Sequence, residues 1–104
     1  FISTGSTYWI SDEEIQILEK NATNGDKNSA FKLYQYHMFV SLDQDSEFKW
    51  LEIAAKNGHP IAQSNLADLF FTQGNKEKAI FWAKKAYRNG AKLPDELKIL
   101  ININ

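Results

Sequence analysis

The 104-residue chain contains no cysteine. This absence excludes a disulfide scaffold, a thiol nucleophile and zinc or iron–sulfur sites with cysteine ligands. No apolar run approaches the ~20 residues that span a bilayer as a helix, and no signal peptide is visible, so we expect no membrane contact. We expect a cytoplasmic protein, or a periplasmic one if Phe1 follows a cleaved signal.

The sequence also lacks the motifs that identify most enzymes. It has no phosphate-binding glycine loop, no nucleophile elbow and no cluster of metal ligands. The acidic stretch DQDSE, residues 43–47, is followed by Phe48 and Ala54 where a calcium loop needs glycine and glutamate. We therefore predict that the chain is not an enzyme and requires no cofactor and no metal.

Only two histidines are present, His37 and His59. His37 falls on an apolar stripe of a predicted helix, where a hydrogen-bonded core histidine is the simplest interpretation. His59 stands in the turn NGHP, and we expect it to be a solvated loop residue. Neither histidine has a serine or a carboxylate at a spacing that indicates a catalytic pair.

Bases are scarce in the first half of the chain and acids in the second. Residues 1–47 carry eight acids against three bases, a net charge of −5, whereas residues 48–104 carry nine bases against five acids, or +4. Such a two-ended distribution can steer a charged partner, but it does not determine the fold.

What the sequence does contain is an internal repeat. WLEIAAKNG, residues 50–58, is echoed further along the chain by WAKKAYRNG, residues 82–90. The same offset pairs Ala30 with Ala62, Trp50 with Trp82 and Gly58 with Gly90. Each copy carries apolar residues at helical spacing and ends in Asn-Gly, which suits a helix terminus. A period of this length indicates helical pairs that stack on one another.

The periodicity and the capping residues predict six helices in a single domain. Their ranges are 12–23, 27–41, 46–57, 60–72, 76–88 and 94–101. Ser11 should cap the first helix, and Pro60 and Pro94 should lie in first turns. The domain divides into an irregular lead (1–10), an N-terminal capping helix (11–25), repeat 1 (26–58), repeat 2 (59–90), and a C-terminal capping helix and tail (91–104). We expect Tyr8 and Trp9 of the lead to pack against the helices.

The segment AQSNLADLFFTQGNKEKAIFWAKKAYRNG, residues 62–90, resembles a Sel-type repeat, an alanine- and glycine-rich relative of the tetratricopeptide repeat. The first copy departs from the second in having Leu42 where the second has Gly74. The resemblance implies an all-α fold, a short right-handed α-α superhelix of about six antiparallel helices. It also implies protein binding, because repeats of this class hold other proteins on an extended face.

The resemblance and the small size together favour an immunity protein, which would neutralise a cognate bacterial toxin by binding over its active site. If that toxin is a nuclease its active site is basic, and the acidic half of the chain is then the expected contact. The candidate partner-binding residues are Asp12, Glu13, Asp43, Asp45 and Glu47, with Tyr36 and Phe39 as aromatic anchors. For each acid, favourable charge at a helix start is the alternative interpretation. We expect a monomer that forms a heterodimeric complex with its partner.

Two alternatives stay open at this point. The chain could be an adaptor, one segment of a longer repeat protein whose apolar tail LKILININ, residues 97–104, covers a neighbour. The basic residues between positions 76 and 92 would suit nucleic acid, but the slightly acidic pI of 6.1 argues against that partner.

Overall fold

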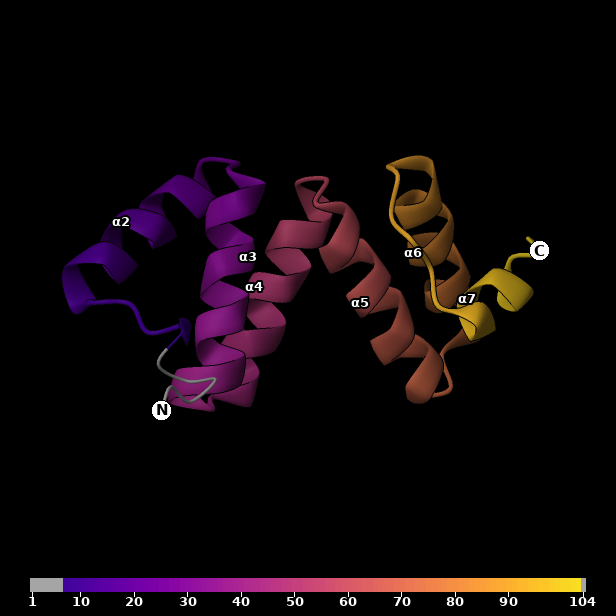
Figure 1. The fold of residues 1–104 in the computed structure, drawn as a ribbon, viewed down its shortest axis with the longest axis horizontal. Coiled ribbons are helices and arrows are strands. Elements are labelled where there is room, and N and C mark those ends of the chain that lie inside the picture. The colour runs from indigo at the N-terminus through magenta and orange to yellow at the C-terminus, as the bar shows by residue number, and fades with distance from the viewer. Residues whose placement is uncertain (1–6, 104) are drawn as a thin grey trace.

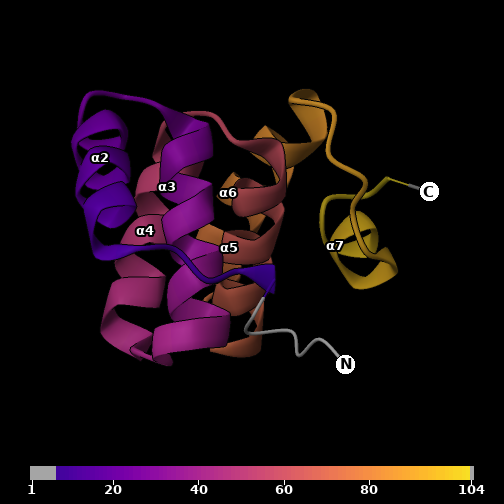
Figure 2. The ribbon, with the colours of Figure 1, turned by 60° about the vertical axis from the view of Figure 1, so that its left-hand side comes forward.

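The computed structural model describes residues 7–103, and every regular element among them is helical. The chain runs through α2 (Asp12–Thr23), α3 (Lys27–Tyr36), the π-helix η1 (His37–Ser41), α4 (Gln44–Lys56), α5 (Pro60–Thr72), α6 (Lys76–Arg88) and α7 (Asp95–Leu100). No β-strand occurs between residues 7 and 103, so the predicted all-α class is confirmed. Helices α2 to α6 lie side by side in chain order, and successive ones run in opposite directions (Figure 1). Figure 2 shows α7 at one end of this row, apart from α2 at the other.

Helices α2, α4 and α6 begin at side-chain caps that recur at a constant interval along the chain. In each case a side-chain oxygen accepts a hydrogen bond from a backbone N–H in the first turn, which would otherwise have no partner. The caps and their donors are Ser11 and Glu14 (3.2 Å), Asp43 and Ser46 (3.4 Å), and Asn75 and Lys78 (3.2 Å). The predicted start of α4 at residue 46 was therefore too late, because Asp43 already caps the helix.

The ends of α4 and α6 are closed by Gly58 and Gly90, as the sequence predicts. Their φ angles of +98° and +90° lie in the left-handed region, where a side chain would be strained. Pro60 then opens α5 in its first turn. Pro94, in contrast, lies one residue before α7 as its N-cap and not in the first turn as predicted.

The predicted helix 27–41 changes to π geometry over its last part, His37–Ser41. This helix has Asp26 as its N-cap and ends at Leu42, which has a φ of +57°. The equivalent stretch of the second pair of helices runs from the N-cap His59 to Gly74, which also has a positive φ. It is one residue shorter than the stretch from Asp26 to Leu42. A π-turn holds more residues than an α-turn, so η1 accommodates the extra residue.

The extra residue changes how the two helical pairs match. Counted from the N-caps of α3 and α5, Ala30 corresponds to Gln63. The predicted pairing of Ala30 with Ala62 is therefore wrong by one position. After η1 the predicted offset holds again, because Asp43 and Asn75 are the equivalent N-caps of α4 and α6.

The core consists of alanines at helix crossings with larger side chains between them. Seven alanines from four helices are completely buried: Ala30, Ala54, Ala62, Ala67, Ala79, Ala83 and Ala86. Small side chains allow the helices to approach closely, and the two repeat tryptophans fill the remaining space. Trp50 is 3% exposed and Trp82 is 9% exposed, which confirms that both belong to the core.

The lead packs only in part as predicted. Tyr8 is half-buried and stacks on Phe39 with ring centroids 4.6 Å apart. Trp9, however, is 64% exposed, so its predicted packing is wrong. The next residue, Ile10, is buried instead and supplies the apolar anchor of this segment. At the other end of the chain, Leu100 and Ile101 pack against the core while Ile99 stays exposed.

Candidate protein-binding surface

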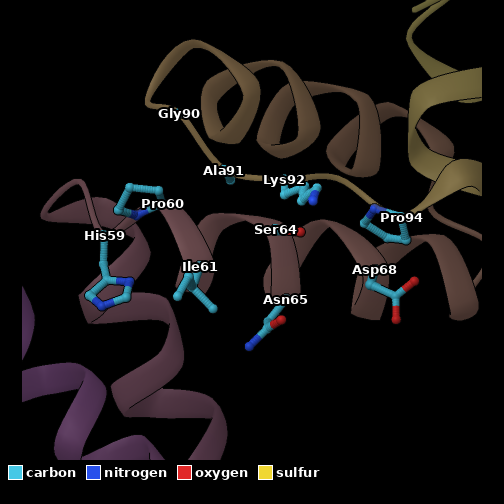
Figure 3. Close-up of a pocket in the computed structure, with 10 residues that line it drawn as sticks. All are labelled: His59, Pro60, Ile61, Ser64, Asn65, Asp68, Gly90, Ala91, Lys92 and Pro94. Atoms are coloured by element: carbon cyan, nitrogen blue, oxygen red, sulfur yellow. The ribbon is translucent and has the colours of Figure 1, made fainter. Parts of the chain in front are cut away.

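A hollow of about 640 Å³ lies along α5. Figure 3 shows Ile61, Asn65 and Asp68 projecting from α5, with the segment that carries Ala91 and Lys92 running beside the helix. The three α5 residues are spaced by four and three positions, so they share one face of the helix. The opposite face is held in the core by residues such as Leu66, which leaves this one available.

Two smaller hollows continue this surface toward α4. Asn65 and Asp68 also line a hollow of about 260 Å³ together with Glu47. Glu47 and Leu69 in turn line a third hollow of about 370 Å³ that reaches Phe48 at the start of α4. We call these three adjoining hollows the α5 groove. It combines exposed apolar groups with carboxylates and amides, so it offers both apolar surface and hydrogen-bonding groups.

The middle of the α5 groove is organised around Tyr34. The Asn65 side-chain amide donates a hydrogen bond of 3.4 Å to the Tyr34 hydroxyl. Burial raises the pKa of Tyr34, and the nearby charge of Glu47 raises it further. The phenol is therefore a neutral hydrogen-bonding group at physiological pH. Glu47 and Asp68 supply negative charge to the groove, and Lys92 at its far side is the one lysine among its lining residues.

Of the seven residues predicted to bind a partner, the structure places only Glu47 in the α5 groove. Asp43 accepts hydrogen bonds from the Ser46 hydroxyl (2.9 Å) and backbone N–H (3.4 Å), and the hydroxyl bond lowers its pKa most. Asp45 lies exposed in the same first turn of α4. Both acids therefore fit the helix-start alternative, although their exposure leaves them accessible to a partner.

The other four predicted residues lie outside the groove lining. Asp12 and Glu13 are exposed in the first turn of α2. Tyr36 is half-buried with its ring edge-on to His37, the centroids 5.1 Å apart. Phe39 is half-buried beneath Tyr8. The two aromatic residues already contact other rings of the chain, so they are less available as anchors than the sequence suggested.

His37 has a structural partner within its own helix. Its Nδ1 atom and the hydroxyl of Ser41 are 2.7 Å apart across η1. Burial lowers the pKa of His37, and the carboxylates of Asp43, Glu19 and Glu47 oppose this effect. His37 is half-buried, so its predicted place in the core is only partly correct. His37 is the first residue of η1. Four side chains of α3 are buried, whereas none of η1 is.

His59 is not the solvated loop residue that the sequence predicted. It is the N-cap of α5, where its Nδ1 accepts a hydrogen bond of 3.2 Å from the N–H of Ala62. Its ring stacks on Phe31 with centroids 4.0 Å apart. Burial lowers the pKa of His59, and Lys27 lowers it further. This histidine thus connects α3 to α5 at one end of the α5 groove.

The sequence interpretation missed the groove residues of α5. Ile61, Asn65 and Asp68 fall on the face opposite the buried stripe, and their helical spacing was visible in the sequence. That signal identifies a solvated face, but it does not show which solvated face is concave. The concavity arises only when α4 and the segment after α6 pack beside α5.

Within residues 7–103, no group of three or more histidine, cysteine or acidic side chains is placed to hold a metal ion. None of the helices described there is both long and apolar enough to cross a membrane.

The part of the chain that the structure describes is thus an all-helical protein with an extended groove on α5. Among known proteins it is similar to Uncharacterized protein YibG of Escherichia coli (strain K12). The two are 34% identical over an alignment of 95 residues, and the match covers 85% of this chain and 62% of the relative. The chain therefore spans less than two thirds of the length of this relative. No protein-family model matches the chain, and no solved structure matches it.

Proposed function

We propose that the chain is a non-catalytic protein-binding module, and specifically an immunity protein that neutralises a cognate bacterial toxin by binding over its active site. The observation that carries this proposal is the α5 groove. Ile61 is 55% exposed at one end of the groove, and Phe48 is 36% exposed at the other. Apolar groups of this size, rimmed by polar side chains, supply the buried centre of a protein interface.

We further propose that the helices form a short right-handed superhelix of Sel-like repeats. Helices α4 and α6 have the same length, and their N-caps Asp43 and Asn75 occupy equivalent positions of the repeat. Both end in an Asn–Gly pair with the glycine at positive φ. These regularities support stacked equivalent units, in which an inner helix of each pair contributes to one continuous face.

The charge of the α5 groove favours a basic partner. Glu47 and Asp68 lie at the shared edges of its hollows. The acidic first turns of α2 and α4 add negative charge to the first half of the chain. A toxin that acts on nucleic acid has a basic active site, so an acidic groove would both attract it and compete with its substrate.

A direct test uses the protein encoded by the reading frame next to this chain. We expect that protein to be toxic or enzymatically active, and to lose its activity when one equivalent of this chain is added. The double variant Glu47→Gln/Asp68→Asn should weaken binding about tenfold, the effect of losing ~1.4 kcal/mol. The matched control is Glu77→Gln/Glu96→Gln, which also removes two exposed acids, from the first turns of α6 and α7 outside the groove.

Two results would contradict this proposal. One is a binding constant that changes as much in Glu77→Gln/Glu96→Gln as in the groove variant, because general charge would then explain the effect. The other is an association rate that does not change with ionic strength, because charge-steered docking is screened by salt.

The second candidate function is an adaptor, in which the chain is a segment of a longer Sel-like or tetratricopeptide-like protein. Two observations favour it: Ile99 on α7 is 72% exposed, and the relative is longer than the chain. An adaptor would bind its partner through the α5 groove without inhibiting it. Measuring the partner's activity in the complex therefore distinguishes the two functions.

A further inference from the structure

A separate hollow of about 310 Å³ lies between the C-terminal ends of α4 and α6. Both helix ends are at the upper edge of the molecule in Figure 1. Three cations line it, and so do three side-chain amides: Lys56, Lys85, Arg88, Asn57, Gln63 and Asn89. No acidic residue is among its lining residues, so we call it the basic hollow. Its charge is opposite to that of the α5 groove.

The amides of the basic hollow are held in place by hydrogen bonds. Gln63 is only 2% exposed, and its Nε2 donates to the carbonyl of Ala55 at 3.0 Å. Its Oε1 accepts a bond of 2.9 Å from Nδ2 of Asn89. A primary amide has two N–H donors, and each of these two amides uses one of them in the bonds described. The buried Gln63 and its partner thus provide a rigid floor that retains hydrogen-bond donors for a ligand.

The cations around this floor are weakly neutralised within the described part of the chain. The Nζ atom of Lys56 is 3.8 Å from Oε1 of Glu52, but this pair is solvent-exposed and contributes little. Lys85 lies over the ring of Phe81, with its Nζ 5.1 Å from the centroid. Among residues 7–103, no carboxylate is within salt-bridge distance of Lys85 or Arg88.

Helix stability explains part of this arrangement but not all of it. A cation in the last turn of a helix interacts favourably with the helix dipole, which accounts for Lys56 on α4 and Arg88 on α6 taken separately. It does not require that cations from two helices converge on one hollow with a buried amide floor. That convergence is the observation that points to an anion.

We propose that the basic hollow binds the phosphate group of a small phosphomonoester. The two negative charges of a phosphate dianion can pair with two of the three cations, whereas the single charge of a carboxylate would leave two cations unpaired. Arg88 can donate two parallel hydrogen bonds to phosphate oxygens, and a lysine acts as a point charge beside them. The hollow has about ten times the ~30 Å³ that a water molecule occupies, which leaves room for the esterified group.

The test is a titration of the ¹⁵N-labelled chain with inorganic phosphate and, in a second arm, with glycerol 3-phosphate. Ionic strength is held at about 0.15 M with sodium chloride so that general screening stays constant. We expect saturable shifts of the Gln63 and Asn89 side-chain amide signals, with a Kd on the order of 1 mM for phosphate. The ester should bind more tightly than free phosphate, because it fills more of the hollow.

Charge-matched variants separate a site from a general effect of basic surface. Arg88→Gln should weaken phosphate binding about tenfold, and Lys56→Gln provides a second variant at an exposed position. The control is Lys84→Gln, which removes the same charge from an exposed position of α6 outside the hollow. This control should leave the Kd nearly unchanged.

Four results would overturn the proposal. The first is a shift that does not saturate, and the second is equal weakening by Lys84→Gln and Arg88→Gln. The third is an ester that binds no better than free phosphate. The fourth is a single-stranded oligonucleotide that binds more tightly than the ester, with shifts along all of α6. That last outcome would assign the surface to nucleic acid. None of these results bears on the α5 groove, so the two proposals can fail independently.

Discussion

Gln63 joins three helices, and a double-mutant cycle can measure how much its hydrogen bonds contribute to stability. From α5 it donates to Ala55 in α4 and accepts from Asn89 after α6. The Ala55 carbonyl also accepts from the N–H of Gly58 at 3.1 Å, so replacing Gln63 does not leave that carbonyl without a partner. Gln63→Met keeps the length of the side chain and removes both bonds. At about 1 kcal/mol net for each bond, we expect it to lower the free energy of unfolding by about 2 kcal/mol.

The cycle uses Asn89→Ala, which removes one of the two bonds from the other side. Because the double variant loses that bond only once, its cost should fall short of the summed single costs by about 1 kcal/mol in urea unfolding. Asn75→Ala is the control, since Asn75 caps the opposite end of α6, roughly 20 Å from Asn89 at about 1.5 Å per residue. Its cost should add to that of Gln63→Met. A Gln63–Asn89 coupling no larger than that of the control pair would refute the bridging role.

Three further predictions concern the ends, the core and the pH dependence of the fold. Gly90→Ala should lower the free energy of unfolding by about 1–2 kcal/mol, because a residue with a Cβ is strained at a φ of +90°. No steric clash adds to this cost, since nothing lies within 4 Å of the new Cβ. An unchanged urea midpoint would contradict this prediction. Leu66 is completely buried, so Leu66→Ala should lower the free energy of unfolding by about 3–5 kcal/mol in guanidinium. A decrease smaller than that of Gln63→Met would contradict this, because it would mean that the surrounding side chains close the cavity. The pKa of His59 is lowered below its ordinary 6.5, so its contribution to stability is complete above pH 6.5 and is lost as the pH falls through 6.5 toward the folded value. His59→Asn retains an N-cap and should reduce this loss in thermal unfolding at pH 7 and pH 5; an identical pH dependence would exclude His59 as its source.

Much of the fold could be predicted from local sequence because helix signals are local. Apolar residues at helical spacing defined α2, α5 and α6 with the bounds that the structure has, helped by Asn-Gly after α2 and α6 and by Gly74 after α5. The start of α4 was predicted at residue 46, which is too late. Asp43 caps the helix before that point, because its carboxylate accepts from both the hydroxyl and the backbone N–H of Ser46.

The candidate site was less predictable than the helices. Acidic clusters at helix starts are conspicuous in a sequence, and they led to Asp12, Glu13, Asp43 and Asp45, none of which lines the α5 groove. Glu47 was included for its charge, and its place between α4 and α5 comes from packing. Asp68 stands between Ala67 and Leu69, and Asn65 follows the uncharged Gln63 and Ser64, so no acidic cluster marked either residue.

The sequence by itself determined where most of the helices begin and end, and which of their faces are buried, because caps, glycines and apolar spacing act over one or two turns. Only the tertiary structure decided that an extra residue before Leu42 is absorbed by a π-turn, and that His59 stacks on Phe31. The tertiary structure also determined where the acidic α5 groove and the basic hollow form. Lys56 and Arg88 end different helices in different copies of the repeat, and they meet at one surface only because α4, α5 and α6 pack together.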